Sequence, residues 1–173
     1  MDIRIGGAAD ADCLLAMFDD AVAWMVDRGQ GDQWGTEPWS RQPDLAGRVR
    51  RLAAEEELWI ADVDHDPAGA LILTGQCPDY VPPAGEPELY VLLLITARPY
   101  TGRAIGAAPL DHARGQARRR GIDLLRVDCW AGAEGRLVDY YASTGFTPAS
   151  RFDLDGWPGR LLEQRLPGGG RVG

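Results

Sequence analysis

The sequence predicts an α/β fold, with a mixed central sheet of about six to seven strands and four helices. Apolar runs of strand length recur along the chain, and between them lie stretches whose apolar residues are spaced three and four apart. The 173 residues, 45% of them hydrophobic and 25% charged, are enough to bury one full core. We therefore expect a single domain at residues 1–166, followed by a flexible glycine-rich tail at 167–173.

Capping, turn and breaker residues bound the expected elements. Asp10 or Asp12 is expected to cap the first helix, which stops near Gly29, and Asp44 to cap the second, which runs to about Glu56. The other two helices are expected at about 104–121 and at 134–143. The expected strands are 3–5, 58–63, 69–74, 89–96, 124–130, 146–154 and 160–166, with hairpin turns at 64–67 and 156–159.

The central stretch, residues 88–110, combines a strand, a turn and a helix. Strand 89–96 is apolar and β-branched enough to be buried on both faces, and Pro99, Gly102 and Gly106 mark the turn that follows. A glycine turn that leads into a helix leaves backbone N–H groups unpaired at a place where the helix dipole favours negative charge. The stretch therefore predicts either a cradle for a phosphate or pyrophosphate, or a plain strand-to-helix connection.

Composition narrows the chemistry and the partners. The net charge of −8 argues against a nucleic-acid partner and favours cationic ligands. All 18 basic residues are arginine, which excludes a Schiff-base lysine. The widely spaced Cys13, Cys77 and Cys129 suggest neither a disulfide framework nor a metal site. Without an apolar run near the ~18 residues of a membrane span, we expect a cytoplasmic protein with no membrane partner.

An irregular segment, residues 30–43, carries aromatic and hydrogen-bonding side chains close together. Gln33, Trp34, Glu37, Pro38 and Trp39 lie within seven positions. Two tryptophans are costly to leave in water, so the segment is expected to pack down as a lid or to line a pocket.

Two motifs together resemble the GNAT N-acetyltransferase family. The turn Pro99-Tyr100-Thr101-Gly102-Arg103-Ala104, followed by Ile105-Gly106, is similar to the family's Gln/Arg-x-x-Gly-x-Gly/Ala turn, with Pro99 in the first position and Arg98 one residue earlier. Tyr141, followed by Gly145-Phe146, is similar to its Tyr-x-x-x-Gly-Phe helix end. The order of elements matches the family over nearly the whole chain.

The resemblance implies a GNAT fold, in which parallel strands 4 and 5 splay apart, and a site for acetyl-CoA without a metal. Tyr141 would protonate the departing thiolate, and Glu88 is the candidate general base unless it is an exposed strand-end charge. Asp79, Tyr80 and Asp20 are the other candidates. Backbone groups at Leu94, Ile95 and Thr96 would bind the pantetheine, and N–H groups of Thr101, Gly102, Arg103, Ala104, Ile105 and Gly106 the pyrophosphate.

The implied reaction is acetyl transfer to a primary amine of a small cationic acceptor, such as an amino sugar, polyamine, amino acid derivative or antibiotic. Carboxylates and aromatic faces suit such an acceptor. The expected lining is Asp20, Trp24, Gln33, Trp34, Trp39 and Tyr80. Pro109 and Glu134 depart from the family pattern. The alternative is therefore a CoA-binding or ligand-binding module of this fold without turnover, or the same fold repurposed for another acyl or natural-product reaction. The closing strands could pair across a homodimer.

Overall fold

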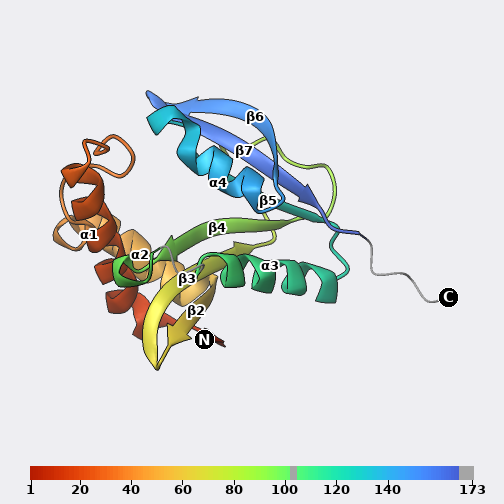
Figure 1. Cartoon of the computed structure of the whole chain (residues 1–173). Coiled ribbons are helices and arrows are strands. Elements are labelled where there is room, and N and C mark those ends of the chain that lie inside the picture. The colour runs from red at the N-terminus through yellow and green to blue at the C-terminus, as the bar shows by residue number, and fades with distance from the viewer. Residues whose placement is uncertain (102–104, 168–173) are drawn as a thin grey trace. The chain divides into compact units, whose positions relative to one another are not determined.

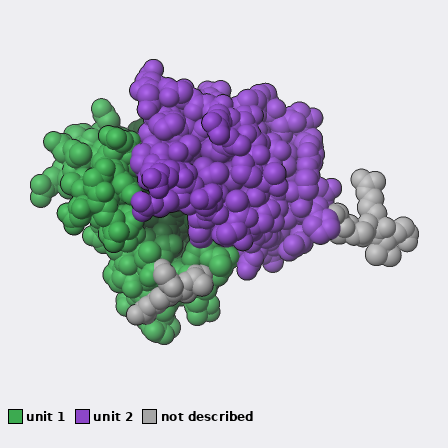
Figure 2. All heavy atoms as spheres, turned by 45° about the horizontal axis from the view of Figure 1, so that its top comes forward, with its two compact units in different colours: residues 1–73, 93–109 green, residues 74–92, 110–173 purple. Residues whose placement is uncertain are grey.

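The structure, a computed structural model, describes residues 1–101 and 105–167. The chain divides into two compact units (Figure 2). Unit 1 comprises residues 1–73 and 93–109, and unit 2 comprises residues 74–92 and 110–173. The expectation of a single domain at 1–166 stays a prediction, and nearly all of the expected tail lies outside the described residues.

Seven strands form one mixed sheet in the described part of the chain, in the order β1-β2-β3-β4-β5-β7-β6. Strands β4 and β5 are parallel, in register from Leu89↔Leu125 to Val91↔Val127, which confirms the predicted mixed sheet (Figure 1). The bounds are β1 (Asp2–Ile5), β2 (Glu57–Val63), β3 (Asp66–Thr74), β4 (Leu89–Thr96), β5 (Leu124–Trp130), β6 (Thr147–Leu154) and β7 (Trp157–Arg165).

Four α-helices accompany the sheet in the described residues: α1 (Ala11–Asp27), α2 (Pro43–Glu55), α3 (Ala107–Arg119) and α4 (Arg136–Ser143). Short 3₁₀ turns supplement them: η1 (Ala8–Asp10), η2 (Trp39–Arg41), η3 (Arg98–Tyr100) and η4 (Ala133–Gly135). No described helix is long and apolar enough to cross a bilayer.

Each unit buries the apolar side chains that its pattern predicts. In unit 1 the inner face of α1 (Leu14, Phe18 and Val22) is buried, as are Ile60 and Ile72 of strands β2 and β3. In unit 2, α4 lies against the sheet formed by β5, β6 and β7 (Figure 1). The buried side chains of unit 2 include Leu89, Tyr90, Leu110, Ala113, Leu124, Leu125, Leu161 and Leu162.

Asp10 lies at the predicted N-cap position of α1 without capping it by a side-chain hydrogen bond, and the prediction that Asp44 caps α2 is wrong. Asp10 precedes α1 but makes no side-chain bond to it, because its carboxylate binds the Arg4 guanidinium at 2.7 Å and accepts the Gly7 N–H at 3.0 Å. Helix α2 begins one residue before Asp44, at Pro43, whose fixed φ and missing N–H suit the first helical position.

Pro109 explains why α3 begins later than predicted. The predicted start near Ala104 is wrong, since the helix begins at Ala107 and Pro109 is its third residue. The first four N–H groups of a helix have no partner within it, so a proline there breaks no hydrogen bond. Pro109 therefore delays the helix without kinking it, and it removes one N–H donor from the helix N-terminus.

Both hairpin turns are shorter than the sequence predicts: the first begins at Asp64 as predicted, and the second begins one residue early, at Asp155. The β2–β3 turn consists of Asp64 and His65, and the β6–β7 turn of Asp155 and Gly156. All four residues have positive φ, as two-residue hairpin turns with a matching twist require. The second prediction, a turn at 156–159, is therefore wrong, and residues 157–159 open strand β7.

Replacing Gly145 with alanine is expected to destabilise the protein by about 1–2 kcal/mol. Gly145 has a φ of +101°, and a Cβ there would lie 2.7 Å from Nε2 of Gln164. Urea unfolding measures the loss. The matched control is Gly115→Ala in α3, which meets no atom closer than 3.5 Å and should stabilise the helix by about 0.5–1 kcal/mol. Equal effects of the two substitutions would contradict the prediction.

Candidate active site

A carboxylate of unit 2, Asp128 on β5, lies beneath two tyrosine hydroxyls. The Tyr90 hydroxyl donates to Oδ1 of Asp128 at 2.5 Å, and the Tyr80 hydroxyl lies 3.5 Å from both carboxylate oxygens. Burial raises the pKa of Asp128, although the hydrogen bonds from the two tyrosines oppose that shift. A carboxylate with a raised pKa is a better proton acceptor than an exposed one.

Tyr90 remains the proton donor in this pair at neutral pH. Its side chain is fully buried, and burial together with the charge of Asp128 raises the pKa of its phenol. Tyr80 comes from the proline-rich loop 75–87, and its ring lies 5.3 Å from that of Phe152. The loop therefore brings a second hydroxyl and an aromatic face to Asp128.

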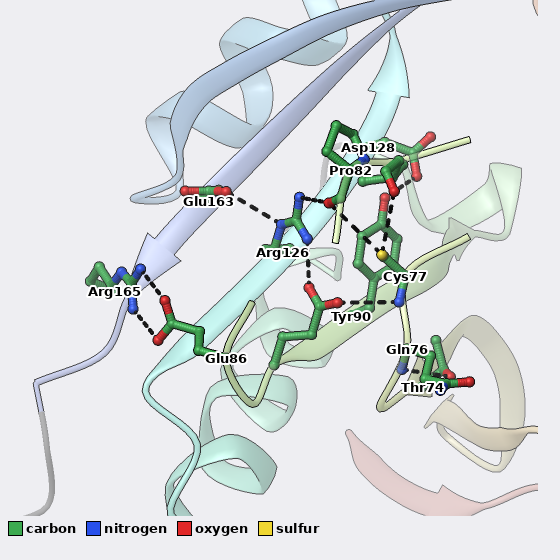
Figure 3. Close-up of polar contacts among 12 residues, drawn as sticks. Thr74, Gln76, Cys77, Pro82, Glu86, Tyr90, Arg126, Asp128, Glu163 and Arg165 are labelled. Carbon is green, nitrogen blue, oxygen red and sulfur yellow. Dashed lines mark hydrogen bonds and ion pairs between the residues drawn. The ribbon is translucent and has the colours of Figure 1, made fainter. Parts of the chain in front are cut away.

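A buried ion pair between Arg126 and Glu88 holds that loop. Figure 3 shows the contacts of Arg126 with Pro82 and Glu163. The Arg126 guanidinium is 2% exposed; it donates from Nη1 to Oε2 of Glu88 at 2.9 Å and from Nη2 to the Pro82 carbonyl at 2.8 Å. The other oxygen of Glu88 accepts the Cys77 N–H at 3.2 Å, and Oε1 of Glu163 lies 3.3 Å from Nε of Arg126. Glu88 is therefore not the exposed strand-end charge that the sequence left open.

Tyr141 of α4 is buried and carries a hydroxyl without a hydrogen bond among the described residues. Its ring packs edge-on against Phe146, with the centroids 5.8 Å apart. Burial, followed by electrostatic interactions with Cys129, Tyr140 and Asp128, raises the pKa of Tyr141, so the phenol is protonated at neutral pH. Burial also raises the pKa of Cys129 to about 12, which keeps that residue a thiol.

The predicted backbone-binding residues belong to unit 1. At the end of β4, Ile95 is buried, whereas Leu94 and Thr96 are half-buried. Gly69 of β3 permits a close approach, since a Cβ there would lie 3.0 Å from the Ile95 carbonyl oxygen. In the turn, Thr101 is exposed and Ile105 buried, while Gly102, Arg103 and Ala104 lie outside the described residues.

The tryptophan-containing segment of unit 1 packs onto α1. The Trp39 ring stacks on Phe18 with centroids 4.3 Å apart, and its Nε1 donates to the Trp34 carbonyl at 3.0 Å. Trp34 also contacts Phe18, at 5.1 Å between centroids. Packing of the segment is therefore confirmed. Its Gln33 is half-buried, and Asp20 on α1 is exposed.

The structure brings some of the predicted residues together and adds others. Tyr80 and Glu88 are both tied to β5, through Asp128 and Arg126 respectively. Neither Arg126 nor Asp128 was singled out from the sequence. The available signal was a pair of charged residues two positions apart in an otherwise apolar strand, which places both side chains on one face.

The fold defines a class of α/β proteins with a mixed sheet in which β4 and β5 are parallel, and comparison with known proteins identifies the family. The sequence model described as "Acetyltransferase (GNAT) family" matches residues 19–146. The match covers more than half of the chain, so the chain belongs to the acetyltransferase (GNAT) family. A search of curated proteins found no match. Among the described residues, no group of three or more potential metal ligands occurs.

Solved structures share the fold at low sequence identity. The ribosomal-protein-S18-alanine N-acetyltransferase of Escherichia coli has a TM-score of 0.68 and 15% identity, covering 99% of this chain and 97% of that one. The ribosomal-protein-alanine N-acetyltransferase of Brucella melitensis has a TM-score of 0.63 and 21% identity, covering 96% and 100%. The yncA protein of Salmonella typhimurium, described with its cofactor acetyl-CoA, has a TM-score of 0.62 and 15% identity, covering 96% and 94%.

Proposed function

We propose that the chain transfers the acetyl group of acetyl-CoA directly to the primary amine of a small acceptor, without a covalent enzyme intermediate. Family membership supports acetyl transfer, and the N-acetyltransferase names of two structural neighbours support a nitrogen acceptor. The observation that carries the proposal is the desolvated carboxylate of Asp128 beneath two tyrosine hydroxyls. An amine must lose a proton to act as a nucleophile, and such a carboxylate can accept it.

Two carboxylates are candidates for the general base. Both oxygens of Glu88, the candidate from the sequence, already accept hydrogen bonds, one of them from a guanidinium. Asp128 has a raised pKa and no cationic partner among the described residues. We therefore assign the base to Asp128 and a positioning role to Glu88, which holds Arg126 and through it the loop that carries Tyr80.

Tyr141 is the proposed general acid. Acetyl-CoA would supply a thioester whose carbonyl carbon the amine attacks and whose sulfur leaves as a thiolate. The Tyr141 hydroxyl is protonated and has no hydrogen-bond partner in the described chain, so it is available to donate to that sulfur. The phenolate left behind and the carboxylic acid of Asp128 return to their starting states by proton exchange with water.

The remaining assignments complete the proposal. Backbone groups of Leu94, Ile95 and Thr96 would bind the pantetheine, and the turn from Thr101 to Gly106 would bind the pyrophosphate. Aromatic faces and carboxylates would recognise a cationic acceptor. The proposed residues are Asp20, Gln33, Trp34, Trp39 and Tyr80. Trp24, which the sequence also suggested, is left out because its ring already contacts the guanidiniums of Arg28 and Arg98.

The second candidate function is a CoA-binding module without turnover. Pro109 in the first turn of α3 favours it, because it removes an N–H donor from the helix N-terminus. Calorimetric titration with acetyl-CoA, followed by an assay for thiol release with a panel of amines, separates the two. Saturable binding with release supports the enzyme, and binding without release supports the module.

Tyr141→Phe is expected to lower kcat by about 10²-fold while leaving the affinity for acetyl-CoA unchanged. The substitution removes the proposed acid but no hydrogen bond among the described residues, so thermal stability should hardly change. Steady-state thiol release and calorimetry measure the two quantities. Tyr140→Phe, which alters the neighbouring, more exposed tyrosine, is the matched control. An unchanged kcat in Tyr141→Phe would remove the residue from the mechanism.

A further inference from the structure

Two arginines of unit 1 stack on one tryptophan. Cζ of Arg98 lies 3.9 Å from the centroid of the Trp24 ring, and Cζ of Arg28 lies 4.4 Å from it. Trp24 lies in the last turn of α1 and Arg28 directly follows that helix, whereas Arg98 comes from η3 beyond β4. Side chains far apart in the sequence thus bring two positive charges to one indole.

The two charges lack a carboxylate partner. Neither guanidinium makes an ion pair or hydrogen bond within residues 1–101 and 105–167, although the chain has 26 acidic residues against 18 arginines. Asp20 and Asp27 lie on the same helix and pair with neither arginine. Burial and the charge of Arg28 lower the pKa of Arg98, which shows that its charged form is disfavoured there.

The cation–π contacts with the Trp24 ring use no N–H donor of either guanidinium. These donors lie in the plane of each guanidinium, where they can bind an oxyanion in a bidentate manner. A bound anion would also offset the repulsion between the two cations. We propose that Trp24, Arg28 and Arg98 form a binding site for an oxyanion, either a carboxylate or a phosphate.

Two molecules could supply this group. If the proposed acetyl transfer is correct, the acceptor carries an acidic group besides its amine, or the site takes a phosphate of CoA. The evidence for the oxyanion site comes only from the geometry of unit 1, so the site can be tested by binding alone, without an assay of acetyl transfer. Loss of activity would therefore not be mistaken for loss of the site.

The test uses inorganic phosphate as the probe, titrated at constant ionic strength into ¹⁵N-labelled protein. The indole N–H signal of Trp24, assigned with Trp24→Phe, should shift in a saturable manner. Arg98→Gln and Arg28→Gln should each weaken phosphate binding by about 10-fold or more, since a charge-assisted bidentate pair is lost. The matched control is Arg48→Gln, which removes an exposed arginine of unit 1 that has no partner in the described chain.

Each outcome decides the proposal. Equal phosphate binding by all three arginine variants, or no shift at Trp24, would overturn the site. If it stands, calorimetry with CoA, 3′-dephospho-CoA and pantetheine identifies the source of the anion. A weaker CoA affinity in Arg98→Gln, with pantetheine unaffected, assigns the site to a cofactor phosphate. Unchanged affinities for all three assign it to the acidic group of the acceptor.

Discussion

Asp128→Asn should lower kcat/KM for acetyl transfer by about 10²- to 10⁴-fold. The amide keeps the shape of the side chain and can still accept the Tyr90 hydroxyl, but it cannot take a proton from the amine. Steady-state kinetics with a responsive amine measures the loss. Asp139→Asn, the same change at an exposed position of α4, is the control. A larger loss in Glu88→Gln than in Asp128→Asn would return the base role to Glu88.

The pH dependence of the same variant gives a second readout. A base must be deprotonated, so the wild-type rate rises with pH through the pKa of Asp128, which burial places above that of an exposed aspartate. Tyr90→Phe removes a hydrogen bond that lowers this pKa, so the acidic limb should move to higher pH. An acidic limb unchanged in both Asp128→Asn and Tyr90→Phe would exclude Asp128 as the titrating group.

Stability should respond to Asp128→Asn in the opposite direction from activity. Because the folded-state pKa is raised above the unfolded value, the folded state binds a proton more tightly, and stability falls as pH rises from the unfolded pKa through the folded pKa. Above the folded-state pKa of Asp128 the wild type has lost that contribution, and an uncharged asparagine avoids the penalty. A higher Tm together with a lower rate would show that the charge of Asp128 lowers stability while it supports the reaction.

Arg126→Met should lower the free energy of unfolding by about 3 kcal/mol or more, the largest effect on stability expected in this protein. The substitution leaves the Glu88 carboxylate, 7% exposed, without its cation, and it frees the Pro82 carbonyl. Urea unfolding at neutral pH measures the change. The double variant Arg126→Met with Glu88→Leu should recover much of the loss, because it removes both charges.

The contrast with a surface pair tests this reasoning. Arg165 and Glu86 are joined by a shorter ion pair, at 2.6 Å, but their side chains are 61% and 39% exposed. Arg165→Met should therefore barely change stability, since water and salt screen the pair. Equal losses in Arg126→Met and Arg165→Met would show that burial does not control the effect.

Helix and strand positions followed from local pattern. The period of the apolar residues predicted four helices and about six to seven strands, and β5 lies where expected, at Leu124–Trp130. The errors fall at the ends of elements, where the contacts of a few side chains decide at which residue a helix or strand begins. Asp10 has a stronger partner in Arg4, and Pro109 moves the start of α3.

The site depended more on tertiary structure than on pattern. Tyr141 and the glycine turn could be named because the motif spacing is similar to that of a known family. Arg126 and Asp128 could not, because a charge in a strand gives no sign of whether it faces water or a buried partner. Their partners, Glu88 and Tyr90, lie 38 residues away in the chain.

The sequence by itself determined the fold class, the order of the elements and membership of the acetyltransferase family, because periodicity and motif spacing are local properties. Tertiary structure alone decided that Glu88 is ion-paired, that Asp128 is desolvated beneath two tyrosines, and that Arg28 and Arg98 share one indole. These features depend on which distant side chains meet and on how much water they lose. Burial and charge pairing set the pKa of a group, and neither can be read from its neighbours in the chain.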